Sequence, residues 1–194
     1  MRHRLWLILL VNSFLLSGCK TVPIDDTEQN QYLTTTDRRA SDAIAIDKDI
    51  EQTAREKLQD NQELLGQSHI VINAYNGLVL VTGEVPDDTV KSKVLEIVSI
   101  TPHVKMVRDS LAIAQPIDKA TRTNDKQLAA DVKAALTQIH TLPNFNSAMV
   151  KVVTEDGVVY LMGRVFREEG NVVINVTRLQ PNIKQIITVF EYLD

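Results

Sequence analysis

The residues best suited to metal binding are scattered along this chain. His69, His103 and His140 are far apart in the sequence, and none of them belongs to a His-x-x-x-His pair, the spacing that places two ligands on one helix face. This pattern predicts histidines at the surface or in turns. We therefore expect no metal ion and no other cofactor.

Acidic pairs and serines also lack a catalytic setting. Asp25-Asp26 falls in a polar N-terminal stretch, and Asp87-Asp88 follows a proline where helix capping explains both acids. No serine stands in a nucleophile-elbow sequence, and the glycines do not form a phosphate-binding loop. These patterns predict a protein that is not an enzyme.

The only cysteine of the chain, Cys19, stands at the end of a secretory signal. A basic start leads into the apolar run at residues 5–16, which is too short to span a bilayer as a helix. The run ends in Leu-Ser-Gly-Cys, which resembles a bacterial lipobox, whose cysteine is acylated, palmitate being one of the chains. The alternative is an ordinary signal with an incidental cysteine. We expect residues 1–18 to be removed and acylated Cys19 to anchor the protein to a membrane.

The residues from Cys19 onward predict the membrane to which the protein is sent and the segment that joins the lipid to the folded part. The residue after the cysteine is Lys20 and not Asp, and in a Gram-negative bacterium the lipobox resemblance then favours transport to the outer membrane. Residues 19–42 are polar and have few apolar side chains, so they are predicted to form a lipidated flexible tether. The alternative, an ordered arm, rests on Tyr32 and Leu33.

The charge of the chain limits the classes of partner. The chain has 21 Lys and Arg against 25 Asp and Glu, and two of the arginines would be lost with the signal. A mildly acidic protein does not capture polyanions over its whole surface. We expect no nucleic-acid partner, and any anionic partner requires a local basic patch.

One stretch occurs twice and organises the rest of the chain. Residues 76–85 read NGLVLVTGEV and residues 156–165 read DGVVYLMGRV, an offset of 80. Asn-Gly and Asp-Gly favour a tight hairpin turn, because that turn needs positive φ. The second glycine of each copy indicates a strand end where the backbone bends or another element comes close. We predict structural glycines at these turns and strand ends: Gly77, Gly83, Gly157 and Gly163.

The flanking sequences repeat in the same order. Apolar periodicity predicts helix, strand, strand, helix and strand in each copy. The first copy places them at residues 47–59, 68–75, 78–83, 86–101 and 104–113. In the second copy a helix begins at Asn124 or Asp125, strands cover 149–155 and 158–163, a helix begins near 167, and the last strand covers 183–192.

This order predicts an α+β protein with two tandem αββαβ domains, residues 43–114 and 124–194, joined by a linker at 115–123. In each domain two helices cover one face of a three-stranded sheet. A domain of about 70 residues is near the small end for independent stability. We therefore expect the two units to pack on each other and to bury apolar residues of their outer sheet faces.

Two such units, each with a central strand like Gly-x-Val-x-Leu-x-Gly-x-Val, resemble BON domains. The lipobox in front of them makes the chain resemble the dual-BON outer-membrane lipoproteins of the DolP type. One departure is His103-Val104 and Asn182-Ile183, where the family often has Gly-Val before the last strand.

The resemblance implies a non-enzymatic lipoprotein on the periplasmic side of the outer membrane that supports envelope integrity and binds anionic phospholipid. It places the phospholipid contact on the first helix of the second domain, where this chain offers Lys126, Gln127 and Lys133 beside Asp131 and no aromatic residue. The alternative is a lipid-anchored adaptor that binds an envelope protein.

Overall fold

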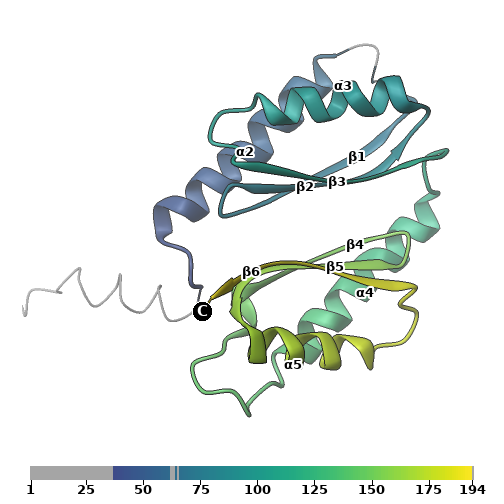
Figure 1. The fold of residues 1–194 in the computed structure, drawn as a ribbon. Helices are drawn as coiled ribbons and strands as arrows, with labels where there is room; N and C mark the ends of the chain where they lie inside the picture. The colour runs from purple at the N-terminus through teal and green to yellow at the C-terminus, as the bar shows by residue number, and fades with distance from the viewer. Residues whose placement is uncertain (1–36, 62–63, 65, 194) are drawn as a thin grey trace, which may run out of the picture.

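The structure, a computed structural model, describes residues 37–61, 64 and 66–193 (Figure 1). The expected signal, Cys19 and most of the expected tether lie outside these residues. The first unit contains α2 (Ser41–Gln59), β1 (His69–Tyr75), β2 (Leu78–Val85), α3 (Asp88–Ser99) and β3 (Met106–Ile113). The second contains α4 (Lys119–Leu136), the 3-10 helix η1 (Ser147–Met149), β4 (Val150–Glu155), β5 (Val158–Phe166), α5 (Arg167–Arg178) and β6 (Gln185–Leu193). The α+β class and the repeated αββαβ order are confirmed.

The two sheets have the same topology. The strand orders are β1-β2-β3 and β4-β5-β6, with the first pair antiparallel and the second pair parallel in each sheet. Asn76 and Gly77 have φ of 52° and 79°, and Asp156 and Gly157 have φ of 46° and 73°. Positive φ at both central residues is what the predicted hairpin turn requires.

Gly83 and Gly163 lie inside β2 and β5, so the prediction that these strands end there is wrong. A Cβ on Gly83 would come within 1.9 Å of the His69 carbonyl oxygen, and one on Gly163 within 2.5 Å of the Met149 carbonyl oxygen. The facing backbone, at the start of β1 in one domain and at the end of η1 in the other, therefore passes too near for any side chain.

Both first helices begin earlier than predicted. Helix α2 starts at Ser41, so the end of the expected tether is helical. Helix α4 starts at Lys119 and is capped by Asp118, whose carboxylate accepts a 2.7 Å hydrogen bond from the Thr121 amide. Most of the expected linker therefore belongs to α4, and Asn124 and Asp125 lie within the helix.

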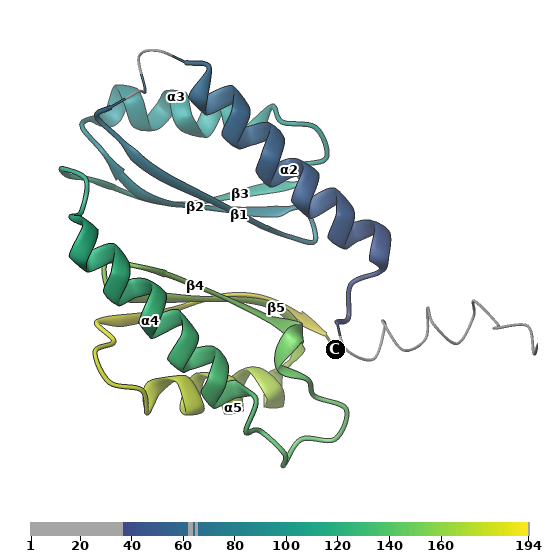
Figure 2. The same cartoon turned by 180° about the vertical axis from the view of Figure 1, so that it is seen from behind.

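Each domain has its own core on the helical face of its sheet. In the first domain Ile50 and Ala54 of α2 and Val94 and Val98 of α3 are fully buried. The second core is built in the same way by residues of α4, α5, β4 and β5, and Val132, Leu161 and Val173 are fully buried within it. Figure 2 shows the helices lying on the outer side of each sheet.

The opposite faces of the two sheets pack against each other (Figure 1). A third apolar cluster joins the domains: Tyr75, Leu80, Val153, Tyr160 and Met162. The prediction that the two units pack on each other through the sheet faces without helices is confirmed. The layers are therefore helices, sheet, sheet and helices.

Among the described residues, no helix combines the length and apolar character needed to cross a bilayer.

Candidate functional site

One exposed face of α4 is basic. Lys119, Arg122, Lys126 and Lys133 are all exposed, and a helix advancing about 100° per residue places them within about 60° of one another. Neither acid of α4 shares this arc, because Asp125 is buried toward the sheet and Asp131 points elsewhere around the helix. The helix therefore presents a narrow positive surface, which we call the α4 basic face.

The structure brings together only some of the residues predicted for phospholipid contact. Lys126 and Lys133 lie on the α4 basic face, two turns apart. Gln127 lies on another side of the helix, where its amide donates a 2.8 Å hydrogen bond to Asp131. Lys119 and Arg122 were missed because they fell in the expected linker, although the capping sequence at Asp118 could have placed them in the helix.

A buried aspartate holds the hairpin turn in each domain. The Asp47 carboxylate accepts hydrogen bonds from the amides of Asn76 (2.7 Å) and Gly77 (2.8 Å). The Asp125 carboxylate accepts the matching bonds from Asp156 (2.9 Å) and Gly157 (2.8 Å). The first helix thus fixes the turn that starts the central strand.

A hollow of about 500 Å³ lies beside the second turn. Gln127 and Asp131 form one side of it, and Lys184 forms another, with its ammonium group 2.6 Å from the Asp156 carboxylate. Its charged side chains have partners within the protein: Asp131 bonds to Gln127, Lys184 pairs with Asp156, and Asp125 accepts the turn amides. Among the described residues, the charges of this hollow are therefore already paired.

The segment before α2 contacts the second domain. Arg38 forms two hydrogen bonds with the Glu169 carboxylate, at 2.5 and 2.6 Å, and a third with the Arg164 carbonyl at 3.1 Å. Burial opposes ionisation of Glu169, but the bonds from Arg38 and from the Phe166 amide outweigh it and hold its pKa below the ordinary value. Residues 37–40 are therefore an ordered arm.

Tyr75 occupies one end of the domain interface. Its hydroxyl donates to the Met149 carbonyl at 3.0 Å, and the Arg39 guanidinium lies 3.9 Å from its ring centre. Burial, and then the negative charge of Asp37, raise the pKa of Tyr75 to about 12. The phenol is therefore neutral under physiological conditions.

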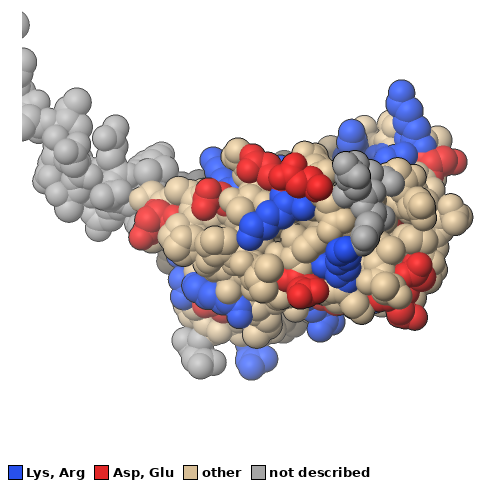
Figure 3. Space-filling model, turned by 90° about the horizontal axis from the view of Figure 1, so that it is seen from above, with Lys and Arg blue, Asp and Glu red and all other residues tan. Residues whose placement is uncertain are grey.

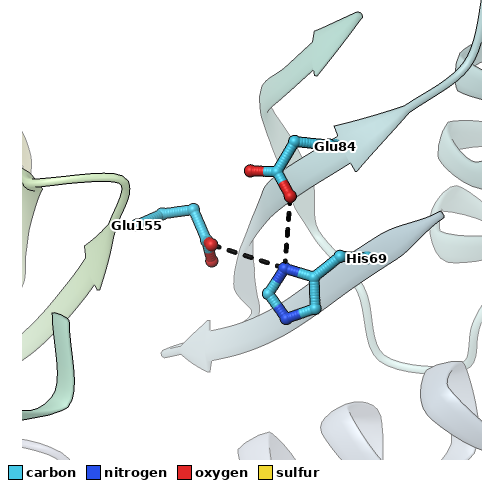
Figure 4. Close-up of side chains that lie close together, drawn as sticks. All are labelled: His69, Glu84 and Glu155. Atoms are coloured by element: carbon cyan, nitrogen blue, oxygen red, sulfur yellow. Dashed lines mark ion pairs between the residues drawn. The ribbon is translucent and has the colours of Figure 1, made fainter. Parts of the chain in front are cut away.

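The other end of the interface holds three groups that can bind a proton or a metal ion (Figure 4). His69 Nδ1 lies 3.5 Å from Glu84 Oε2 and 3.4 Å from Glu155 Oε1. Burial first, and then the charges of Glu84 and Asp125, raise the pKa of Glu155 to about 7, against a smaller opposing effect of Arg122. We call His69, Glu84 and Glu155 the interface triad.

The two ends correspond through the internal repeat. By the offset of 80, Glu155 matches Tyr75, while His69 and Glu84 match Met149 and Arg164. The interface therefore has approximate two-fold symmetry. Tyr75 lies at one end, and Glu155 lies at the equivalent position at the other end. Sequence spacing missed the triad because its members come from β1, β2 and β4 of two domains.

The surface seen in Figure 3 mixes acidic and basic side chains without a large field of one sign. The chain has a net negative charge, and its acidic and basic side chains are mixed on this surface. Any anionic partner is therefore still expected to need a local basic patch. The α4 basic face is such a patch.

Both units match one protein family. Residues 46–115 and residues 124–194 match the BON domain. The outer membrane lipoprotein DolP of Haemophilus influenzae is 26% identical over 187 residues, which cover 96% of this chain and 95% of that protein. The 21 kDa hemolysin of Actinobacillus pleuropneumoniae is 22% identical over 157 residues, covering 81% and 79%. The C-terminal domain of CdsD, a structural protein of the Chlamydia trachomatis type III secretion system, is 14% identical, with a TM-score of 0.31 and coverage of 75% of this chain and 96% of that one.

Proposed function

The chain belongs to the BON domain family, and from that premise we propose that it is an outer-membrane lipoprotein that supports envelope integrity and contacts anionic phospholipid. Acylated Cys19 is the anchor, and the domains face the periplasm. The similarity to the DolP lipoprotein along nearly the whole chain supports the location and the anchor. The proposed role is binding rather than catalysis.

The observation that carries the phospholipid contact is the α4 basic face. Each Lys or Arg close to an anionic membrane surface contributes on the order of 1 kcal/mol of attraction. Lys119, Arg122, Lys126 and Lys133 lie on one side of a rigid helix, so they can approach a flat surface together. Such a contact is weak without an anchor.

The lipid anchor makes a weak contact sufficient. Acyl chains hold the domains within reach of the bilayer, so the contact of α4 becomes an intramolecular event with a high effective concentration. Because the attraction is between exposed charges, salt screens it. Binding is therefore expected to depend on both lipid charge and ionic strength.

Vesicle co-flotation of residues 20–194 tests this proposal without the anchor. We expect binding to anionic vesicles at low salt, weaker binding at moderate salt, and none to neutral vesicles. Replacing Lys126 and Lys133 with Gln is expected to reduce binding. The matched control replaces Lys48 and Arg55 with Gln, because these exposed cations occupy the corresponding positions of α2 and the change in charge is the same.

Equal losses in both double variants would show general charge attraction and would contradict a specific role of α4. No binding to either type of vesicle would contradict direct phospholipid contact. That result would favour the alternative, an adaptor for an envelope protein. Exposed apolar side chains at Leu179 (81%), Ile100 (68%) and Met106 (61%) are the surface features that fit this alternative.

A further inference from the structure

We propose that the interface triad binds a divalent transition-metal ion, with zinc as the best match, and that this ion joins the two BON domains. The ligands are His69 Nδ1 of β1, a carboxylate oxygen of Glu84 in β2, and a carboxylate oxygen of Glu155 in β4. The three ligand atoms lie within 4.8 Å of one another. This proposal does not rest on the proposed phospholipid contact.

The distances fit a small ion with tetrahedral geometry. Bonds of about 2.0–2.1 Å to zinc place neighbouring tetrahedral ligands about 3.3 Å apart. The imidazole nitrogen lies 3.4 Å from one carboxylate and 3.5 Å from the other. The two distances from His69 Nδ1 to the carboxylates are therefore close to those between zinc ligands. Only the distance between the two carboxylate oxygens would have to shorten.

One polar atom of the site is buried without a hydrogen-bond partner. Among the described residues, His69 Nδ1 is buried and has no hydrogen-bond partner. Thr82 is completely buried, and its hydroxyl faces Glu155 closely enough to lower the pKa of that carboxyl group. An ion would engage the free nitrogen.

The charges also favour a divalent cation. Glu84 and Glu155 are 4% and 7% exposed, and two carboxylates this close repel each other strongly away from water. A divalent ion balances both negative charges. An imidazole nitrogen in the ligand set favours zinc over magnesium or calcium, which prefer oxygen ligands.

The surroundings position the ligands and leave a way in. Glu84 Oε2 accepts a 3.1 Å hydrogen bond from the Ile117 amide, which orients this carboxylate toward His69. The His69 side chain is 21% exposed, so an ion can reach the site from solvent. Because Glu155 belongs to the second domain, a bound ion would resist separation of the two sheets.

Calorimetric titration with zinc chloride tests the site in the mature acylated protein, purified in detergent without a polyhistidine tag and stripped with EDTA. We expect one zinc ion per chain and a higher thermal midpoint with zinc, reversed by EDTA. His69→Gln and Glu155→Gln are each expected to weaken binding on the order of 10-fold or more. The matched controls His140→Gln and Glu96→Gln replace exposed residues of the same types and should bind as the parent does.

Several results would overturn the proposal. These are the absence of saturable zinc binding in the parent protein, and unchanged affinity in both triad variants. Displacement of zinc by an equal concentration of magnesium would contradict the nitrogen ligand. Glu155→Gln guards against a folding artefact, because it removes one of two repelling buried charges and should leave the metal-free protein folded, as circular dichroism can show.

Discussion

At the scale of single residues, His103 adopts a backbone conformation that only glycine adopts without cost. Its φ is 67°, in the left-handed region, and its side chain is exposed. The matching residue of the second domain, Asn182, has a φ of 65°, but asparagine tolerates this region better. The first domain therefore carries a local strain that the second largely avoids.

Replacing His103 with Gly is expected to stabilise the protein by about 1 kcal/mol, because the strain disappears and no buried contact is lost. Urea unfolding measures the change. His103→Ala is the control, since it removes the imidazole but keeps a Cβ in the left-handed conformation. If Ala stabilised as much as Gly, the imidazole rather than the backbone would be the cause.

At the scale of elements, the buried aspartate of each first helix connects the helix to the hairpin turn. Asp125 lies one turn before Leu128 on the buried face of α4 and accepts two backbone amides from the turn. Those amides have no other partner in the described contacts. The turn of the second domain therefore depends on a side chain of α4.

Replacing Asp125 with Ala is expected to cost about 3 kcal/mol of unfolding free energy, because it leaves the amides of Asp156 and Gly157 unpaired next to the core. Chemical denaturation measures it. Asp131→Ala on the same helix is the control, with an expected effect within about 0.5 kcal/mol, since among residues 37–61, 64 and 66–193 Asp131 bonds only to Gln127. Similar costs at both positions would contradict the special role of Asp125.

The helices also show how far the sequence predicts this fold. The order of elements followed from the repeated Asn-Gly and Asp-Gly turns, because few other dipeptides accept two positive φ angles. The start of α4 was missed because its buried residues begin only at Asp125, so the first turns carry no apolar periodicity. Apolar patterning detects the buried part of a helix and not its exposed beginning.

The candidate sites were less predictable than the fold. Lys126 and Lys133 lie on one helix face, which sequence spacing within α4 can predict. His69, Glu84 and Glu155 are brought together only when two sheets from two domains pack face to face. The alternation of side chains along a strand predicts that all three lie on the sheet face without helices. It does not predict that these faces of the two sheets pack against each other.

At the scale of the whole molecule, the arm before α2 makes the stability of the assembly depend on pH. The pKa of Glu169 is held below its ordinary value by Arg38, so the folded state favours the ionised carboxylate. This contribution is complete above the ordinary pKa, 4.5, and is lost as the pH falls through the lower folded value. The pair therefore favours the folded state at neutral pH and not in acid.

Glu169→Gln is expected to destabilise the protein at neutral pH and to have a smaller effect in acid, because protonation already removes the parent's ion pair there. Thermal unfolding of parent and variant across this range measures the difference. Glu96→Gln changes an exposed acid in the same way and is the control. A difference that stayed constant from neutral to acidic pH would contradict the assigned ion pair.

The Arg38–Glu169 pair also affects how a pulling force on the N-terminal segment is transmitted to the two domains. If the chain before residue 37 is held at a membrane, a pull on it reaches Arg38 before it reaches α2. The two hydrogen bonds to Glu169 and the bond to the Arg164 carbonyl pass part of that force directly to the second domain. Tension would therefore load both domains together, with the packed sheets between them, instead of peeling the first helix from its own core.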